Sequence, residues 1–459
     1  MTQTPPYQVT DPATGEVAET FPFATDAEVE QALAATTAAF TAWKKRPLAE
    51  RVAIVKRVAE LFTERATELA ALITKEMGKR PAQAVGEAEF CTAIFDYYAE
   101  NGPRLLEDRP LPGHDAARVE YLPVGPVLGV MPWNYPYYQV ARFAAPALVV
   151  GNVVIVKHAE NCPSSALAIA QIMKDAGVPE GVYVNIFATH EQVATMIADP
   201  RLRGVSLTGS ERAGTVVAAQ AGRNLKKVVL ELGGSDPYII LDTPDVEDAA
   251  ETAWGTRMEN VGQACNSNKR MIVMDDVYDD FVAALVKRAA AMTPREPGDD
   301  SDEAYSPMVS RKAAENLLAQ VQDAVSKGAT LHVGGQIVGD KGAYFAPAVL
   351  TGVTPEMRAY KEELFGPVAV VYKVTSDDEA VKLANVVDFG LGGAVWSADE
   401  NRATQVAEQL EVGMANVNTP AGEGADLPFG GTKRSGFGRE LGPLGIDEFV
   451  NKRLFYVQK

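Results

Sequence analysis

Short apolar runs alternate with helix-like segments over most of the chain after residue 124, and this alternation restricts the fold more than any other feature. The runs lie at 125–133, 152–157, 182–187, 204–209 and 227–234. Between two of them, a helical segment has Pro at its start and Gly just past its end, as helices commonly do. Repeated strand–helix–strand units form a parallel sheet with helices on both faces. The sequence therefore predicts an α/β fold.

The alternation starts again after Gly234. Apolar runs at 237–241 and 271–275 are followed by helical patterns, the second of them at 277–292. A chain of 459 residues is longer than one hydrophobic core usually serves. We therefore expect a second α/β domain.

Three segments flank these domains. The first hundred residues have mostly helical periodicity. Residues 103–123 are rich in Pro, Gly and charge, which indicates a linker or an exposed hairpin. The tail, 453–459, is typical of one apolar strand, which needs a partner in this subunit or another.

Charge and composition exclude several classes of protein. The net charge of −18 argues against a nucleic-acid or anionic-membrane surface. The most apolar stretch, 143–156, is shorter than the roughly 20 residues that span a bilayer, and the N-terminus has no secretory signal. The three cysteines form no CxxC pair and no metal-like spacing with the histidines. We expect a cytoplasmic protein without a metal site.

Several common catalytic and nucleotide motifs are missing. The sequence contains no G-x-G-x-x-G after a strand, no Walker A loop, no H-E-x-x-H and no G-x-S-x-G. A dinucleotide site would therefore have to use another device.

Cys265 is the first candidate for chemistry. It lies in G-Q-A-C-N-S-N-K-R, just before a strand, among small polar neighbours. A free cysteine is most often a small buried hydrophobe, but this loop offers no apolar pattern for it to complete. A loop held by a sheet suits a nucleophile. Because a free thiol has a pKa of about 8.5, the site would have to favour the thiolate.

Glu231 and Asn134 each end an apolar strand. Glu231 is either a structural ion-pair partner or a general base whose pKa is raised by burial. Asn134 is either a turn residue between two prolines or an amide donor for a developing oxyanion. The residues alone leave both choices open.

Seven motifs in order resemble those of the aldehyde dehydrogenase superfamily. They are P-W-N-Y-P (132–136), K-H-A-E (157–160), T-G-S (208–210), L-E-L-G-G (230–234), G-Q-A-C (262–265), E-L-F-G-P (363–367) and P-F-G-G (428–431). The segment 131–148 is most similar to bacterial succinate-semialdehyde dehydrogenases.

The resemblance implies a covalent mechanism. Cys265 attacks the aldehyde, Asn134 and the Cys265 backbone N–H hold the oxyanion, and Glu231 activates water to hydrolyse the thioester. Relatives that pass the acyl group to coenzyme A typically lack this glutamate, so Glu231 implies a free acid as product. The three intact residues also argue against a catalytically silent binding or structural member of the fold.

The resemblance also implies a nicotinamide dinucleotide cofactor, without the usual phosphate loop. The implied cofactor residues are Trp133, Lys157, Glu160, Gly209, Ser210, Glu363 and Phe365. Gly209 and Ser210 open a helix near the pyrophosphate, where free N–H groups suit an anion. A surface ion pair of Lys157 with Glu160 is the alternative. Glu160 would bind both ribose hydroxyls of NAD and repel a 2′-phosphate, so we expect NAD to be preferred, with NADP possible.

The implied architecture has two Rossmann-like domains and a small oligomerisation element. The dinucleotide domain takes 1–104 and 124–234, the catalytic domain takes 235–440, and the oligomerisation element takes 105–123 and 441–459. The terminal strand would join a neighbouring subunit's sheet and give a homodimer or homotetramer.

The substrate is implied less directly. Arg142 matches an arginine that semialdehyde enzymes use for the substrate carboxylate, and a surface ion pair is its alternative. Two positions depart from those relatives: Ala264 precedes the nucleophile, and Glu423 stands where they often have serine. The expected substrate is succinate semialdehyde, and the alternative is a neutral, aromatic or amino aldehyde.

Overall fold

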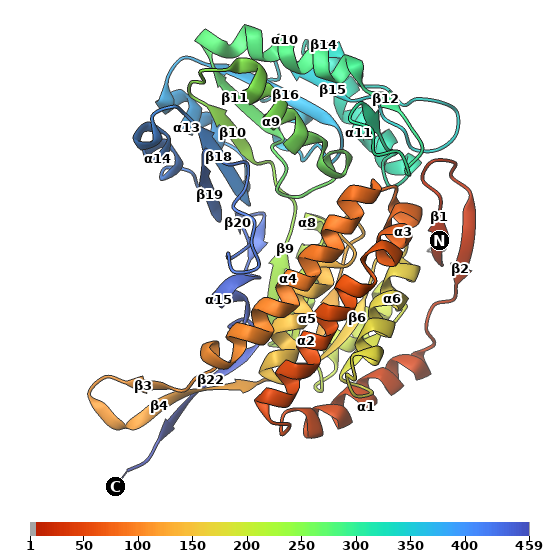
Figure 1. Cartoon of the computed structure of the whole chain (residues 1–459), viewed down its shortest axis with the longest axis vertical. Coiled ribbons are helices and arrows are strands. Elements are labelled where there is room, and N and C mark those ends of the chain that lie inside the picture. The colour runs from red at the N-terminus through yellow and green to blue at the C-terminus, as the bar shows by residue number, and fades with distance from the viewer. Residues whose placement is uncertain (1–5, 459) are drawn as a thin grey trace.

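The structure, a computed structural model, describes residues 6–458. Two sheets form two lobes, one above the other (Figure 1). In sheet order, the lower lobe contains β21 (Gly436–Phe437), β9 (Lys227–Glu231), β8 (Gly204–Thr208), β5 (Pro126–Val130), β6 (Val153–Lys157) and β7 (Tyr183–Asn185). All neighbouring strands here are parallel except the edge pair β21–β9.

The upper lobe contains the second predicted sheet. Its order is β14 (Thr330–Val333), β15 (Ala348–Thr351), β16 (Val368–Val374), β11 (Arg270–Met274), β10 (Pro237–Ile240), β18 (Gly392–Trp396) and β19 (Met414–Val417). Only the edge pair β14–β15 is antiparallel. The α/β prediction with two parallel-sheet domains is confirmed.

Helices cover both sheets. The lower lobe has α1 (Asp26–Trp43), α2 (Leu48–Glu64), α3 (Ala66–Met77), α4 (Pro81–Leu105), α5 (Tyr138–Val150), α6 (Pro163–Asp175), α7 (His190–Ala198) and α8 (Glu211–Arg223). The upper lobe has α9 (Val246–Met258), α10 (Asp275–Ala291), α11 (Arg311–Ser326), α13 (Asp377–Asn385) and α14 (Glu400–Ala407). In the lower core, Phe62 of α2 stacks on Phe95 of α4 with ring centroids 5.6 Å apart. No described helix is both long and apolar enough to cross a membrane.

An arm projects from the lower lobe and ends near the C-terminus (Figure 1). It contains β3 (Arg109–Leu111), β4 (His114–Pro123) and β22 (Val450–Tyr456) in the order β22-β4-β3. Residues 103–123 thus include the exposed hairpin that was one of the two expectations. The terminal strand pairs with β4 of its own chain, so only its outer edge is open to a neighbouring subunit.

Two connections differ from the sequence-based expectation. The first hundred residues include a hairpin, β1 (Tyr7–Thr10) and β2 (Val17–Phe21), as well as helices. Its signal is missing locally because Tyr7 is held by distant groups: its hydroxyl donates to the carbonyls of His158 and Ala188, both at 3.2 Å. In addition, β21 lies within the range 235–440 expected for the second domain, yet it pairs with β9 of the first sheet.

Candidate active site

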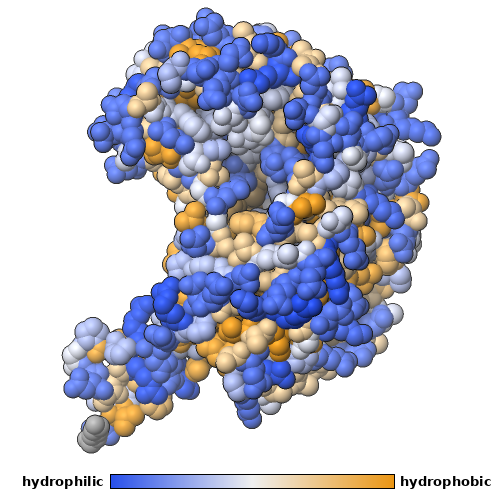
Figure 2. Space-filling view, viewed as in Figure 1, coloured by the Kyte–Doolittle hydropathy of each residue, from blue (hydrophilic) through white to orange (hydrophobic). Residues whose placement is uncertain are grey.

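The predicted site residues gather where parallel strands end. Asn134 follows β5, Lys157 ends β6, Gly209 follows β8 and Glu231 ends β9, so all four lie at the carboxyl edge of the lower sheet. Cys265 comes from the upper lobe, on the loop before β11. The surface is hollowed between the two lobes (Figure 2). Ligands of open α/β sheets bind at this edge.

Cys265 lies between two cavities. One cavity of about 290 Å³ is lined by Cys265 and by six further predicted residues: Trp133, Asn134, Gly209, Ser210, Glu363 and Phe365. The other, of about 490 Å³, is lined by Cys265, Glu423 and aromatic side chains. The thiol can therefore meet two ligands at once. We call the first the cofactor cavity and the second the substrate cavity.

Two of the seven predicted cofactor residues, Lys157 and Glu160, do not line the cofactor cavity. Lys157 donates to Glu160 with 2.5 Å between Nζ and Oε1, and His190 Nε2 lies 3.5 Å from the same carboxylate oxygen. The Lys157–Glu160 ion pair proposed as the alternative for these residues is therefore present. The carboxylate is already paired, and it remains 30% exposed.

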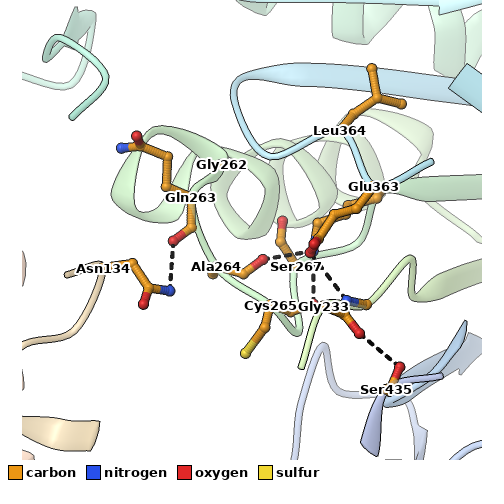
Figure 3. A network of polar contacts seen from close by, with 12 residues as sticks. Asn134, Gly233, Gly262, Gln263, Ala264, Cys265, Ser267, Glu363, Leu364 and Ser435 are labelled. Atoms are coloured by element: carbon orange, nitrogen blue, oxygen red, sulfur yellow. Dashed lines mark hydrogen bonds and ion pairs between the residues drawn. The ribbon is translucent and has the colours of Figure 1, made fainter. Parts of the chain in front are cut away.

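A buried lysine anchors the loop that carries the nucleophile. Lys269 Nζ donates to the carbonyls of Ala264 at 2.6 Å and Cys265 at 2.7 Å, and it lies 3.1 Å from Glu363 Oε1. Glu363 in turn accepts the backbone N–H of Gly234 at 3.1 Å. Figure 3 shows this convergence of Glu363, Gly233 and the Cys265 loop. Lys269 is in the quoted motif, but nothing in the sequence showed which carbonyls it would reach.

Arg257 joins the same loop to the E-L-F-G-P segment. Its buried guanidinium donates to the carbonyls of Leu364 (2.7 Å), Gly366 (2.5 Å) and Val368 (2.8 Å), and to the Ser267 hydroxyl at 2.8 Å. Burial lowers the pKa of Arg257 to about 9. The sequence did not identify Arg257, because most of its partners, Ser267, Leu364, Gly366 and Val368, lie ten or more positions away along the chain.

The environment of Cys265 does not favour the thiolate. Burial raises the pKa of the thiol to about 12, while the charges of Arg142 and Lys269 lower it. Glu363 and Glu231 raise it further. Burial therefore outweighs the two cations in its effect on the pKa of the thiol. The thiol needs a base to take its proton.

Glu231 has the environment of such a base. It is 2% exposed, and neither of its carboxylate oxygens has a hydrogen-bond partner. Burial raises its pKa well above the usual range, and the negative charge of Glu440 adds to that effect, while Arg142 opposes it. A carboxyl with a raised pKa can take a proton near neutral pH and return it.

Asn134 lines the cofactor cavity. Its side chain is buried, and Nδ2 donates to the Gln263 carbonyl at 3.1 Å (Figure 3). Asn260 Nδ2 donates to the Asn134 backbone carbonyl at 3.0 Å, which fixes the turn. A side-chain amide has two N–H donors, so one is left for an oxyanion beside Cys265.

Arg142 lies behind the wall of the substrate cavity rather than in it. Its Nε is 2.8 Å from Glu440 Oε2, and Nη2 donates to the Gln139 amide oxygen. The guanidinium lies 4.5 Å from the Tyr138 ring centroid and 4.4 Å from that of Phe429. The structure therefore does not place Arg142 among the residues that line the substrate cavity, where the expected contact with a substrate carboxylate would need it. The reason is Glu440, a buried carboxylate that the sequence did not identify as its partner.

Glu423, which stands where semialdehyde enzymes often have serine, lines the substrate cavity. The side chain is exposed, and Oε1 accepts from Asn266 Nδ2 at 3.4 Å, one residue beyond the nucleophile. Among residues 6–458, no group of three or more His, Cys, Asp or Glu side chains could hold a metal ion.

Known proteins are similar to this chain in both sequence and fold. Residues 1–454 match the model of the aldehyde dehydrogenase family. A succinate-semialdehyde dehydrogenase [NADP(+)] from Deinococcus radiodurans is 53% identical over 98% of this chain and 94% of its own. One from Mycobacterium bovis is 41% identical over 98% of this chain and all of its own.

A solved structure agrees with these relatives. Succinic semialdehyde dehydrogenase from Streptococcus pyogenes, in complex with NADP+, superposes with a TM-score of 0.95 at 39% identity, covering 99% of this chain and 100% of that one. The names of all three relatives specify NADP+, so they give no support to the expected preference for NAD.

Proposed function

The chain belongs to the aldehyde dehydrogenase family, and we propose that this member oxidises succinate semialdehyde to succinate with NADP+. The observation that carries the chemistry is the position of Cys265 on the walls of both cavities, with the buried base Glu231 near it. The substrate and the cofactor come from the relatives, which share 39–53% of their residues with this chain.

The proposed reaction uses four groups of this chain. Glu231 accepts the thiol proton, Cys265 Sγ attacks the aldehyde carbon, and the Asn134 amide with the Cys265 backbone N–H stabilises the oxyanion. When bound, the nicotinamide dinucleotide accepts the hydride, which leaves a thioester on Cys265. After Glu231 has released that proton to solvent, its carboxylate takes a proton from a water, which attacks the thioester and frees the acid and the Cys265 sulfur. No acyl acceptor other than water is required.

The chain's own residues fit a dinucleotide in the cofactor cavity. Ser210 caps the N-terminus of α8, and Gly209 leaves room for a phosphate near its free N–H groups. Trp133 and Phe365 meet edge to face, with centroids 5.7 Å apart, and offer apolar surface for the nicotinamide ring. Glu363, held by Lys269, can accept hydrogen bonds from a ribose.

One assay tests this proposal. Purified protein, succinate semialdehyde and NADP+ should give reduced cofactor and succinate in equal amounts, without coenzyme A. Turnover that requires coenzyme A, or none with any aldehyde, would contradict the proposed function.

The cofactor preference has its own test at Glu160. Its negative charge opposes a 2′-phosphate, although Lys157 at 2.5 Å offsets much of it. We predict that the native chain prefers NADP+ and that Glu160→Ser raises the NADP+/NAD+ ratio of kcat/KM by about tenfold, the equivalent of one charged hydrogen bond. Steady-state rates with both cofactors measure this. A preference of the native chain for NAD+ would contradict the predicted cofactor. An NADP+/NAD+ ratio of kcat/KM that is unchanged in Glu160→Ser would contradict the role of Glu160.

We propose the division into domains described above, with β21 added to the dinucleotide domain because it pairs with β9. We also propose a homodimer or homotetramer assembled through the arm. All three cysteines are free, which supports a reducing compartment such as the cytoplasm.

A further inference from the structure

The turn between β5 and α5 carries Asn134 and is held by side chains from distant parts of the chain. Asn260 Nδ2 donates to the Asn134 carbonyl at 3.0 Å. His158 Nε2 donates to the Pro136 carbonyl at 2.8 Å, since its Nδ1 accepts the N–H of Ala159. Both contacts hold carbonyl groups. The N–H groups at the end of the turn need acceptors as well, because the first N–H groups of a helix have no partner within it.

Glu87 of α4 supplies this acceptor. Its Oε1 accepts the backbone N–H of Tyr137 at 2.8 Å and that of Tyr138 at 3.2 Å. Tyr137 is the N-cap residue of α5, and its own side chain makes no capping hydrogen bond. The carboxylate of α4, which packs against α5 (Figure 1), takes that place. The helix dipole also favours a negative charge at this end.

Lys79 holds the carboxylate of Glu87 from its other side. Its Nζ lies 2.5 Å from Glu87 Oε2, and neither side chain is more than 1% exposed. The same ammonium lies 3.6 Å from the centroid of the Tyr135 ring, one residue beyond Asn134. Removing either partner would leave a buried charge uncompensated, which is costly. One buried ion pair therefore fixes the turn at three of the four residues that follow Asn134.

The position of this turn matters because oxyanion stabilisation depends closely on geometry. The donor has to lie about 2.7–3.1 Å from the oxygen that becomes negative. A displacement of about 1 Å can cost roughly 100-fold in rate. One N–H of the Asn134 amide is already committed to the Gln263 carbonyl, at 3.1 Å. The direction of the other N–H is then set by where the backbone of the turn lies.

We propose that Glu87 is a positioning residue of the reaction: together with Lys79 it fixes the turn that carries Asn134, and so directs the Asn134 amide at the oxyanion beside Cys265. This inference rests on the proposed function, because it requires Cys265 to form a tetrahedral intermediate. Glu87 acts through two backbone N–H groups, and the role needs an acceptor rather than a proton donor.

Two double variants separate the acceptor from the charge. Both contain Lys79→Met, so that no buried ammonium is left without a partner. Glu87→Gln keeps an oxygen that can accept the two N–H groups, whereas Glu87→Met has a similar length and no such oxygen. Glu76→Met is the matched control. Glu76 is 1% exposed and accepts the N–H groups of Ser164 at 2.6 Å and Ser165 at 3.0 Å, at the start of α6.

Two reagents for Cys265 separate the oxyanion from the thiol. 4-Nitrophenyl acetate transfers its acetyl group to the sulfur through a tetrahedral oxyanion and releases nitrophenolate. Iodoacetamide alkylates the same sulfur by displacing iodide, and no oxyanion forms. The ratio of the two second-order rate constants therefore reports on the oxyanion site, without cofactor and without aldehyde. Cys265→Ser gives the background from other groups.

The acylation/alkylation ratio should stay near the native value in the Glu87→Gln double variant and in Glu76→Met. In the Glu87→Met double variant it should fall by about tenfold or more, with little change in alkylation. On succinate semialdehyde, kcat and kcat/KM of this variant should fall by the same factor, as for an interaction made only in the transition state.

Several outcomes would overturn the proposal. They are an unchanged ratio in the Glu87→Met double variant, an equal fall in Glu76→Met or in the Glu87→Gln double variant, and an equal loss of alkylation. A rise in KM alone would assign Glu87, which lines the substrate cavity, to substrate binding instead. If the Glu87→Met double variant does not fold, Glu87→Asp decides: it keeps the charge but withdraws the acceptor, and an unchanged ratio overturns the proposal.

The positioning role and the proposed function fail in different ways. If the native chain is acylated by the ester but oxidises no aldehyde, the proposed function fails, and the ratio still decides the role of Glu87. If the ester does not acylate Cys265 in the native chain, there is no oxyanion site to position, and the proposal is overturned.

Discussion

Glu231 is the residue whose chemistry depends most on its neighbours. Its carboxyl is buried at the end of β9 without a hydrogen-bond partner, beside the carboxylate of Glu440 and the guanidinium of Arg142. Gly430 leaves room for the Glu231 carboxyl, because a Cβ at position 430 would lie 2.7 Å from Glu231 Oε1. The folded protein therefore stabilises the protonated form of the Glu231 carboxyl, so that a proton taken by its carboxylate during the reaction is held more strongly.

This raised pKa makes stability depend on pH. The folded state holds the Glu231 proton to a higher pH than the unfolded chain does, whose carboxyl titrates near 4.5. The stability linked to this proton is complete below that pH and is lost as pH rises toward the folded-state pKa. Glu231→Gln does not titrate. We predict that its free energy of unfolding, relative to the native chain, increases with pH above 4.5, by at most about 1.4 kcal/mol per pH unit.

Urea unfolding at several pH values between 4 and 8 would measure this difference. Glu64→Gln provides a control of opposite sign, because hydrogen bonds from Arg57 lower the pKa of Glu64. Its stability relative to the native chain should decrease as pH rises to 4.5 and stay constant above that pH. A Glu231→Gln difference that stays constant over the whole range would contradict the account of this residue.

At the scale of elements, the loop that carries Cys265 is held close to the end of β9. A Cβ on Gly234 would lie 2.5 Å from the backbone carbonyl oxygen of Cys265 and 3.2 Å from Leu391 Cβ. Lys269 holds that same carbonyl from the other side at 2.7 Å. The glycine pair in L-E-L-G-G therefore lets two segments from different lobes approach each other.

Gly234→Ala should displace this loop. We predict a loss of about 1–3 kcal/mol in stability, typical of overpacking, and a lower kcat, because the oxyanion would no longer face the Asn134 amide. Gly255→Ala is the matched control: it lies in helix α9 with nothing within 4 Å of an added Cβ. It should stabilise the protein by roughly 0.5–1 kcal/mol. Equal effects of the two changes in unfolding and turnover assays would contradict the close approach.

The sequence predicted the strands and the site residues at their ends, but not all the contacts that hold the site together. Strands β5 to β11 follow from apolar runs between helical patterns, and the site residues at their ends follow from the motifs. Arg257 and Glu440 could not be found in this way, because their contacts join segments that are far apart along the chain. The surroundings of Arg142 could not be predicted for the same reason: the resemblance gave its position in the sequence, but its guanidinium is held by Glu440, which is distant along the chain.

In the whole molecule, the arm has a strand edge that no other strand of the described chain covers. β22 pairs on one side only, and its side chains Leu454 and Tyr456 are 62% and 58% exposed. The space-filling view shows apolar surface near the tip of the arm (Figure 2). An open edge with apolar side chains is suited to pairing with another subunit.

We predict that the native chain is a homo-oligomer and that Leu454→Glu combined with Tyr456→Glu converts it to smaller species. Two buried like charges at the interface would outweigh the apolar contact. Size-exclusion chromatography with light scattering measures the mass. Val325→Glu, on the exposed face of α11, is the control and should keep the native mass. A native monomer, or an unchanged mass in the double variant, would contradict this role of the arm.

In the proposed mechanism, Cys265 carries the acyl group and Glu231 releases it. Mass spectrometry of Glu231→Gln, quenched after mixing with NADP+ and succinate semialdehyde, tests both at once. We predict an acyl adduct on the Cys265 peptide and reduced cofactor in a burst that approaches the number of sites but forms more slowly than in the native enzyme, because the thiol has lost its base; turnover should be slowed by about 10²–10⁴-fold. An adduct on Cys91 or Cys162, or a similar burst in Cys265→Ser, would contradict it.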